Sequence, residues 1–243
     1  MAIRKVGVLG CGLMGSGIAE IAAKAGFETV VREVSDGLLE KGMGRIRGSL
    51  ARAVEKGNAE VTITDAHVVL GRIQGTTGFE AMADCDLVVE AIVENLDEKK
   101  STYAALDKVV QPAAIFASNT SSLTVTQLAM ATSRPSRFVG LHFFNPVPVM
   151  KLVEVVRTLL TDDAVLAEVD VFCRALGKTP VACRDNSGFI VNRLLVPYLL
   201  DAIRALEEGV GSVADIDEGM KLGCGYPMGP FQLLDFVGLD TTY

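Results

Sequence analysis

Two side chains in the middle of the sequence, His142 and Glu154, are of the types that perform acid–base chemistry. His142 ends an apolar, strand-like run, and a second such run contains Glu154 beyond a turn that is rich in proline. If a hairpin is centred on Pro148, the two side chains lie opposite each other, with Cβ atoms about 5 Å apart. A carboxylate beside an imidazole fixes its tautomer and stabilises its cationic form, so the pair is predicted to act as a general acid/base. The alternative is a structural histidine at a strand end.

Two further polar side chains, Ser121 and Asn192, could hold the oxygen atoms of a substrate. Ser121 follows a strand-like run at 114–117, and α/β sheets bind ligands at the carboxyl ends of such strands. Its hydroxyl group can both donate and accept a hydrogen bond. Asn192 lies in the first turns of a long amphipathic helix. The alternatives stay open here: the Ser121/Ser122 pair could cap a helix, and Asn192 could be an ordinary polar helix residue.

A glycine motif near the amino terminus predicts a dinucleotide site. Gly10, Gly12 and Gly15 form G-x-G-x-x-G between an apolar strand and a helical pattern. The start of that helix offers free N–H groups to a pyrophosphate. Glu33 follows 23 residues after Gly10, where a carboxylate can bind ribose hydroxyls and repel a 2′-phosphate, which favours NAD. The neighbouring Arg32 keeps NADP as an alternative, and a glycine-rich turn without a ligand is the other.

A local basic stripe could hold a second phosphorylated ligand. Residues 41–56 contain five basic side chains and only one acidic side chain, in a chain whose net charge is −7. On a helix, one face would carry the positions with a spacing of three or four: Lys41, Arg45, Ser49, Arg52 and Lys56. A solvated helix face is the alternative, and the glycines at 42, 44 and 48 weaken the helix prediction.

The elements that must position these residues form an α/β pattern. Strands are expected at 6–10, 29–33, 86–91, 114–117, 137–142 and 152–156, with helical patterns between most of them. This alternation predicts a Rossmann-type doubly wound sheet, followed by a smaller all-helical domain. We expect an NAD-binding domain at 1–184 with a helical insertion at about 36–71, and a helical domain at 185–243. The second domain should contain helices over 189–208, from a cap at Ser212 to about Gly223, and from Pro230.

Composition excludes several classes of function. The acidic net charge of −7 argues against nucleic acid as a partner. Five cysteines without CxxC spacing and only two histidines argue against a disulfide framework or a metal site, and favour a cytoplasmic location. No apolar run reaches the length of about 18 residues that a membrane span needs, so no membrane association is expected.

The motifs together resemble one family, the L-3-hydroxyacyl-CoA dehydrogenases, and within it the stand-alone bacterial 3-hydroxybutyryl-CoA dehydrogenases. The blocks that carry the resemblance are GCGLMGSGIAE, LVVEAIVEN, SNTSSL, GLHFFNPVPVMKLVEVV, DNSGFIVNRLLVPY and GYPMGPFQLLDFVGLD. The resemblance implies an oxidoreductase of fatty acid metabolism that interconverts L-3-hydroxyacyl-CoA and 3-ketoacyl-CoA with NAD.

The resemblance also implies roles for individual residues. The catalytic set is His142, Glu154, Ser121 and Asn192. The cofactor contacts are Gly10, Cys11, Gly12, Leu13, Met14, Gly15, Glu33, Glu94, Lys99, Asn119 and Ser121. The contacts with the acyl-CoA substrate are Ser49, Lys56 and Asn145. Ser49 and Lys56 also lie on the basic stripe, so two independent interpretations point to the same surface.

One departure from the family concerns the carboxyl end. Members of the family run several tens of residues further, through helices that form much of a dimer interface. We therefore expect the helical domain to be truncated at Tyr243 and a homodimer to form when those helices are present. Two alternatives remain: a non-catalytic NAD-binding sensor or structural protein, and a dehydrogenase for a hydroxy acid without coenzyme A.

Overall fold

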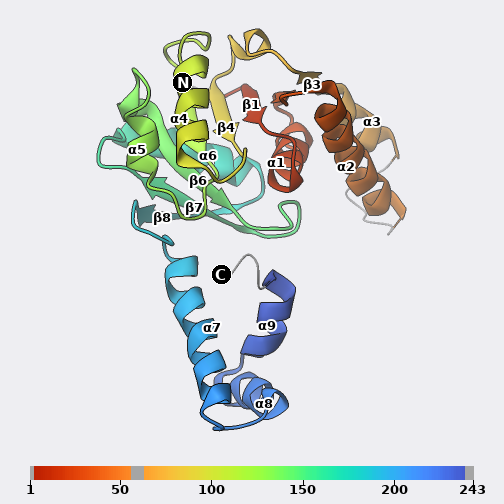
Figure 1. Ribbon diagram of the computed structural model, residues 1–243. Coiled ribbons are helices and arrows are strands. Elements are labelled where there is room, and N and C mark those ends of the chain that lie inside the picture. The colour runs from red at the N-terminus through yellow and green to blue at the C-terminus, as the bar shows by residue number, and fades with distance from the viewer. Residues whose placement is uncertain (1–2, 56–62, 239–243) are drawn as a thin grey trace. The chain divides into compact units, whose positions relative to one another are not determined.

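The computed structural model describes residues 3–55 and 63–238 (Figure 1). The chain divides into two compact units, Met1–Ser187 and Gly188–Tyr243. The first is an α/β unit and the second is helical. The predicted fold class is therefore confirmed.

A mostly parallel sheet forms the centre of the first unit, with strand order β3-β2-β1-β4-β5-β6-β7-β8. Neighbouring strands are parallel except β6 and β7, which form an antiparallel hairpin. The strands are β1 (Lys5–Leu9), β2 (Glu28–Arg32), β3 (Ile73–Thr76), β4 (Leu87–Glu90), β5 (Ile115–Ser118), β6 (Phe138–Phe143), β7 (Leu152–Arg157) and β8 (Thr179–Arg184).

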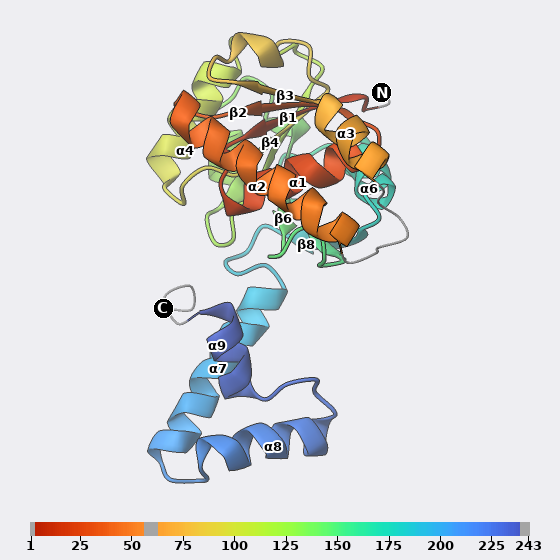
Figure 2. The same cartoon turned by 90° about the vertical axis from the view of Figure 1, so that its right-hand side faces the viewer.

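Helices connect the strands and pack beside the sheet. They are α1 (Leu13–Lys24), α2 (Asp36–Glu55), α3 (Ile63–Gly71), α4 (Leu96–Leu106), α5 (Val125–Ala129) and α6 (Asp163–Ala175), with short 3-10 turns at Glu80–Met82 and Pro135–Arg137. The pair α2 and α3 fills the predicted insertion, and Figure 2 shows α2 crossing in front of α1, with which it is in contact.

Alternation along the buried strands divides the core between the two faces of the sheet. On β5, Ile115 and Ala117 join the large cluster that includes α1 and α6. Phe116 points to the other face, where its ring contacts Tyr103 of α4. Side chains two residues apart on a strand share a face, so Ser118 lies on the α4 side as well.

The strand prediction was incomplete at both edges of the sheet. β3 and β8 were not predicted, because each lacks a buried apolar run: only Ile73 of β3 is buried, and β8 is largely exposed. β8 contains Pro180, which an edge strand tolerates because one side of its backbone needs no ladder partner. The predicted ends of the other strands differ from the observed ends by at most one residue, and β2 ends at Arg32, so that Glu33 follows the strand.

The second unit contains α7 (Val191–Glu207), α8 (Val213–Cys224) and α9 (Pro230–Val237). Pro197 lies inside α7, and Ser212 caps α8 in a reciprocal capping box with Asp215. α8 ends at Cys224, and the capping residue Gly225 has a φ of 70°, the left-handed conformation that glycine adopts without strain. Pro230 is the first residue of α9, as predicted.

Candidate active site

The hairpin of β6 and β7 places His142 directly opposite Glu154, which confirms the predicted pairing. His142 Nδ1 lies 2.7 Å from Glu154 Oε2. The His142 side chain is 5% exposed and that of Glu154 is fully buried. A fully buried carboxylate is expensive unless it is paired, so this contact fixes both the orientation of the imidazole ring and its tautomer.

A second buried ionic group lies at the carboxyl ends of β4 and β5, on the α4 face of the sheet. Lys99 of α4 donates to Glu90 Oε1 at 2.6 Å, and both side chains are fully buried. Ser118 Oγ donates to Glu90 Oε2 at 2.7 Å. Lys99 was predicted from the sequence as a site residue, but Glu90 and Ser118 were not. The sequence feature that could have revealed Glu90 is its place in the apolar strand LVVE, because an ionised side chain in a buried strand needs a buried partner.

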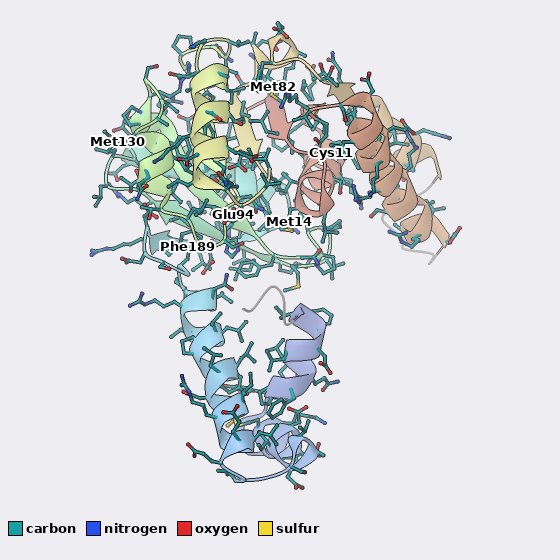
Figure 3. The ribbon with its side chains drawn as sticks, viewed as in Figure 1. Cys11, Met14, Met82, Glu94, Met130 and Phe189 are labelled. Carbon is teal, nitrogen blue, oxygen red and sulfur yellow. The ribbon has the colours of Figure 1, made fainter. Side chains whose placement is uncertain are left out.

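Glu94, which Figure 3 labels near one end of α4, connects this ionic group to the segment that carries Ser121. Its carboxylate lies 3.0 Å from Lys99 Nζ and accepts hydrogen bonds from the Thr120 hydroxyl and, at 2.9 Å, from the Ser121 amide. Burial raises the pKa of Glu94, but the hydrogen bond from Thr120 and the charge of Lys99 outweigh this effect, and the pKa is lowered. Glu94 therefore stays ionised and holds the backbone at Ser121.

Asn119 joins the ends of β5 and β6. Its side-chain oxygen accepts a hydrogen bond of 2.9 Å from the backbone amide of Phe143, next to His142. The backbone N–H of Asn119 donates a hydrogen bond of 2.8 Å to the backbone carbonyl of Glu90. Asn119 thus links the three strands whose carboxyl ends carry Glu90, Ser121 and His142.

Ser121 is exposed and does not cap a helix, so the capping alternative is wrong. The first amides of α5 are bound by Asp185 instead: its carboxylate accepts from Val125 N at 3.0 Å and from Thr126 N at 2.7 Å. The Ser121 hydroxyl group therefore does not cap α5. Asn192 is the second residue of α7 and belongs to the helical unit.

The glycine loop after β1 has the geometry that a dinucleotide needs. Gly10 has a φ of 86°, and a Cβ atom at Gly15 would lie 1.8 Å from the Gly10 carbonyl oxygen. No side chain caps the start of α1, and nothing lies within 4 Å of a Cβ atom built at Gly12. Free N–H groups at an open helix start suit a pyrophosphate. Glu33 Oε1 accepts a hydrogen bond of 2.6 Å from Cys11 N, which places the carboxylate beside this loop.

Lys41, Arg45, Ser49 and Arg52 of the basic stripe lie on one continuous helix, α2, despite its glycines. Gly42 is required there because a Cβ atom would lie 2.3 Å from Cys11 Sγ, so α2 packs closely against the glycine loop. Arg45, Ser49 and Arg52 line a cavity of about 370 Å³ together with Leu13 of α1 and residues Asn145, Pro146, Val147 and Pro148. The structure thus brings Ser49 and Asn145 together. Lys56 lies outside the described residues.

Within residues 3–55 and 63–238, no group of three or more side chains could hold a metal ion. No helix in that part of the chain is long and apolar enough to cross a membrane.

Comparison with known proteins gives matches over nearly the full chain. Residues 5–186 match the NAD-binding domain of 3-hydroxyacyl-CoA dehydrogenase, and residues 188–243 match the carboxy-terminal domain of the same enzyme. The mitochondrial hydroxyacyl-coenzyme A dehydrogenase of Homo sapiens is 52% identical over 99% of this chain and 78% of its own length. The 3-hydroxybutyryl-CoA dehydrogenase of Mycobacterium tuberculosis is 50% identical over 99% of this chain and 84% of its own length.

Solved structures with a similar fold include an enzyme with the same name as these relatives. The (S)-3-hydroxybutyryl-CoA dehydrogenase PaaH1 from Ralstonia eutropha is 44% identical, with a TM-score of 0.95 over 99% of this chain and 84% of that one. Because both domains match and the identities are high over nearly the whole length, this chain belongs to the 3-hydroxyacyl-CoA dehydrogenase family and is an oxidoreductase that uses NAD.

Proposed function

We propose that this protein interconverts L-3-hydroxyacyl-CoA and 3-ketoacyl-CoA, with 3-hydroxybutyryl-CoA or a similar short-chain thioester as substrate. The observation that carries the proposal is the buried pair of His142 and Glu154, whose atoms lie 2.7 Å apart at the end of β6. When bound, NAD would supply the hydride chemistry at C3 of the hydroxyacyl group.

His142 is the general acid/base. Its Nδ1 atom is engaged by Glu154, so Nε2 is the nitrogen that exchanges a proton with the substrate. In oxidation, Nε2 takes the proton of the 3-hydroxyl group, and Glu154 stabilises the resulting imidazolium. In reduction, the same proton returns to the oxygen at C3. The Ser121 hydroxyl and the Asn192 amide hold the substrate oxygens.

The cofactor is held at the carboxyl ends of the central strands. Residues 10–15 offer backbone N–H groups to its pyrophosphate, and Glu33 binds the adenosine ribose. Glu94, Lys99, Asn119 and Ser121 form the side of the site near the nicotinamide. Support comes from the hydrogen bonds that join Glu94 to Ser121 and Asn119 to the residue after His142.

The coenzyme A portion of the substrate contacts Ser49, Lys56 and Asn145. The cavity of about 370 Å³ that contains Ser49, Arg52 and Asn145 supports this assignment. We place the protein in the cytoplasm and in fatty acid metabolism. We further propose that it forms a homodimer through its helical unit when the helices that follow in its relatives are present. Exposed apolar side chains of that unit favour this, including Leu194 (70% exposed), Leu222 (77%) and Phe236 (65%).

Consumption of NADH with a panel of ketones tests the substrate class. Acetoacetyl-CoA should be reduced with a kcat/KM far above that of free acetoacetate, because only the thioester can use the α2 cavity. Longer 3-ketoacyl-CoA substrates then measure the preference for short chains. Equal rates with acetoacetate and acetoacetyl-CoA would identify a hydroxy-acid dehydrogenase that does not recognise coenzyme A, and NADH binding without turnover of any substrate would identify a sensor.

A further inference from the structure

An arginine, Arg32, directly precedes Glu33 in the sequence, and the proposed function gives a role only to the carboxylate. Arg32 is the last residue of β2, and its backbone carbonyl accepts a hydrogen bond of 2.9 Å from Gly10 N at the start of the glycine loop. Arg32 and Glu33 therefore both lie at the strand end that borders the proposed cofactor site. A charged group at this place can act on the charge of the cofactor.

The side chains of Arg32 and Glu33 turn to opposite sides of β2. The Glu33 carboxylate accepts a hydrogen bond of 2.6 Å from Cys11 N, in the loop that follows β1. Arg32 Nε instead donates to the Thr77 carbonyl at 3.1 Å, in the segment that follows β3. β2 lies between β1 and β3 in the sheet, and consecutive residues of an extended chain point to opposite faces. The carboxylate and the guanidinium group therefore flank the end of β2.

Thr77 and Phe79 hold the guanidinium group in place. The Cζ atom of Arg32 lies 4.3 Å from the centre of the Phe79 ring, which is the geometry of a cation–π contact. The segment that carries Thr77 and Phe79 is itself fixed to the end of β2, because Glu33 N donates to the Thr76 carbonyl at 3.0 Å. The arginine side chain is therefore held in one place before a ligand binds, which reduces the entropy cost of binding.

Most of the hydrogen-bonding capacity of this guanidinium group remains available to a ligand. The group has five N–H donors, and within the described part of the chain only the donor at Nε has a protein acceptor, the Thr77 carbonyl. No carboxylate within residues 3–55 and 63–238 forms an ion pair with Arg32. The two terminal nitrogens form a planar fork that matches the oxygens of a phosphate group. An unbalanced positive charge thus lies beside the carboxylate that we propose binds the adenosine ribose.

We propose that Arg32 is a specificity-determining residue for the cofactor, and that its guanidinium group binds the 2′-phosphate of NADP when that cofactor enters the site. Glu33 keeps NAD preferred, because its carboxylate repels the same phosphate. The two charges oppose each other, so the preference for NAD is smaller than Glu33 alone would produce. The proposal rests on the part of the proposed function in which Glu33 binds the ribose, and it does not depend on the acyl-CoA substrate.

Binding of NADPH and NADH in the absence of substrate, measured by the fluorescence of the reduced nicotinamide, tests the role of Arg32. The variants are Arg32→Ala, Glu33→Ser and the double variant. Arg184→Ala is the control, because it removes an equal charge at the end of β8, the opposite edge of the sheet from β3. Loss of a charge-assisted hydrogen bond should raise the dissociation constant of NADPH about tenfold in Arg32→Ala and leave that of NADH unchanged. Glu33→Ser should bind NADPH more tightly than the parent does, and the double variant should lose about tenfold of that affinity.

The comparison of the two cofactors separates the outcomes. If the dissociation constants of NADPH and NADH rise together in Arg32→Ala, the side chain contacts a part that both cofactors share, and the assignment to the 2′-phosphate is wrong. NADPH binding that does not depend on Arg32, with or without Glu33, also overturns the proposal. If Glu33→Ser leaves NADPH binding unchanged while Arg32→Ala weakens it, the role of Glu33 in the proposed function is wrong and that of Arg32 stands. Should Arg32→Ala fail to fold, Arg32→Lys, which keeps the charge but loses the fork, gives the same comparison with a smaller loss.

Discussion

At the scale of single residues, the site depends on polar side chains that share one face of the sheet. Glu90, Ser118 and His142 occupy the ends of β4, β5 and β6, on the side where α4 supplies Lys99. Strand alternation explains why they meet, since residues two apart on each strand point to the same face. Each is buried and has a hydrogen-bonding partner, which offsets the free-energy cost of burying charge and fixes the side chain in position.

Replacing Glu154 by Gln tests the orienting role of the carboxylate. The variant retains a hydrogen-bond acceptor but loses the negative charge that stabilises the imidazolium. We expect turnover to fall and the pH dependence of kcat to change, while the melting temperature changes little. The pH–rate profile of the variant is the decisive measurement, because an unchanged profile would mean that Glu154 does not support proton transfer at His142.

Replacing Glu90 by Gln tests the ionic group that sequence analysis missed. The change leaves the fully buried Lys99 with only the partly exposed Glu94 as its anionic partner. Removal of one partner of a buried ion pair costs roughly 3 kcal/mol of unfolding free energy. NADH binding should weaken as well, since Lys99 positions Glu94. Glu98→Gln, on the exposed face of α4, is the control. Equal stability of the two variants in urea would refute the structural importance of Glu90.

Replacing Glu33 by Ser tests cofactor choice. The Glu33 carboxylate accepts a hydrogen bond of 2.6 Å from the backbone N–H of Cys11, so its charge lies beside the glycine loop. Without it, the repulsion of a 2′-phosphate is lost, and the ratio of kcat/KM for NADPH to that for NADH should rise. If the ratio stays constant, Glu33 does not face the ribose.

Sequence reasoning at this scale found His142 with Glu154 because a hairpin with a central turn fixes its own register. It missed Glu90, whose partner Lys99 comes from the next helix and meets it only in the folded unit. Local periodicity does not report contacts of this kind.

At the scale of elements, close packing of α2 against the glycine loop links the two proposed ligand sites. A Cβ atom at Gly42 would lie 2.3 Å from Cys11 Sγ and 2.5 Å from the Cys11 carbonyl oxygen. Arg45, one turn further along α2, donates to the same carbonyl at 3.3 Å. The glycines that weakened the helix prediction are thus explained in part by this contact.

The variant Gly42→Ala should therefore disturb the loop that we propose binds the pyrophosphate. Overpacking of this kind costs about 1–3 kcal/mol, which exceeds the gain in helix propensity. We expect a lower melting temperature and weaker NADH binding. Gly44→Ala, at a position with nothing within 4 Å of a Cβ atom, should instead stabilise the helix by up to about 1 kcal/mol. If Gly42→Ala behaves like Gly44→Ala, α2 does not constrain the loop.

Elements in the middle of the sheet were predictable, and those at its edges were not. The inner strands are apolar because both of their faces are covered, whereas β3 and β8 carry few buried side chains. The helix ends that have caps, at Ser212 and Pro230, were located correctly because capping is local chemistry.

At the scale of the whole molecule, the two units match the two domains of one enzyme family. The first unit holds the glycine loop, the pair of His142 and Glu154, and the cavity that contains Ser49 and Asn145. The second unit carries Asn192 on α7. We therefore assign proton transfer to the first unit, where a buried carboxylate orients the imidazole.

Steady-state reduction of acetoacetyl-CoA by NADH, compared between the parent protein and His142→Asn, tests this assignment most directly. Asn has a similar size but cannot exchange a proton, and general acid–base catalysis contributes about 10²–10⁴-fold. We predict a loss of turnover in that range, with NADH binding, measured by the fluorescence of the bound cofactor, unchanged. Turnover close to that of the parent protein would contradict the account, because proton transfer would then have to occur elsewhere.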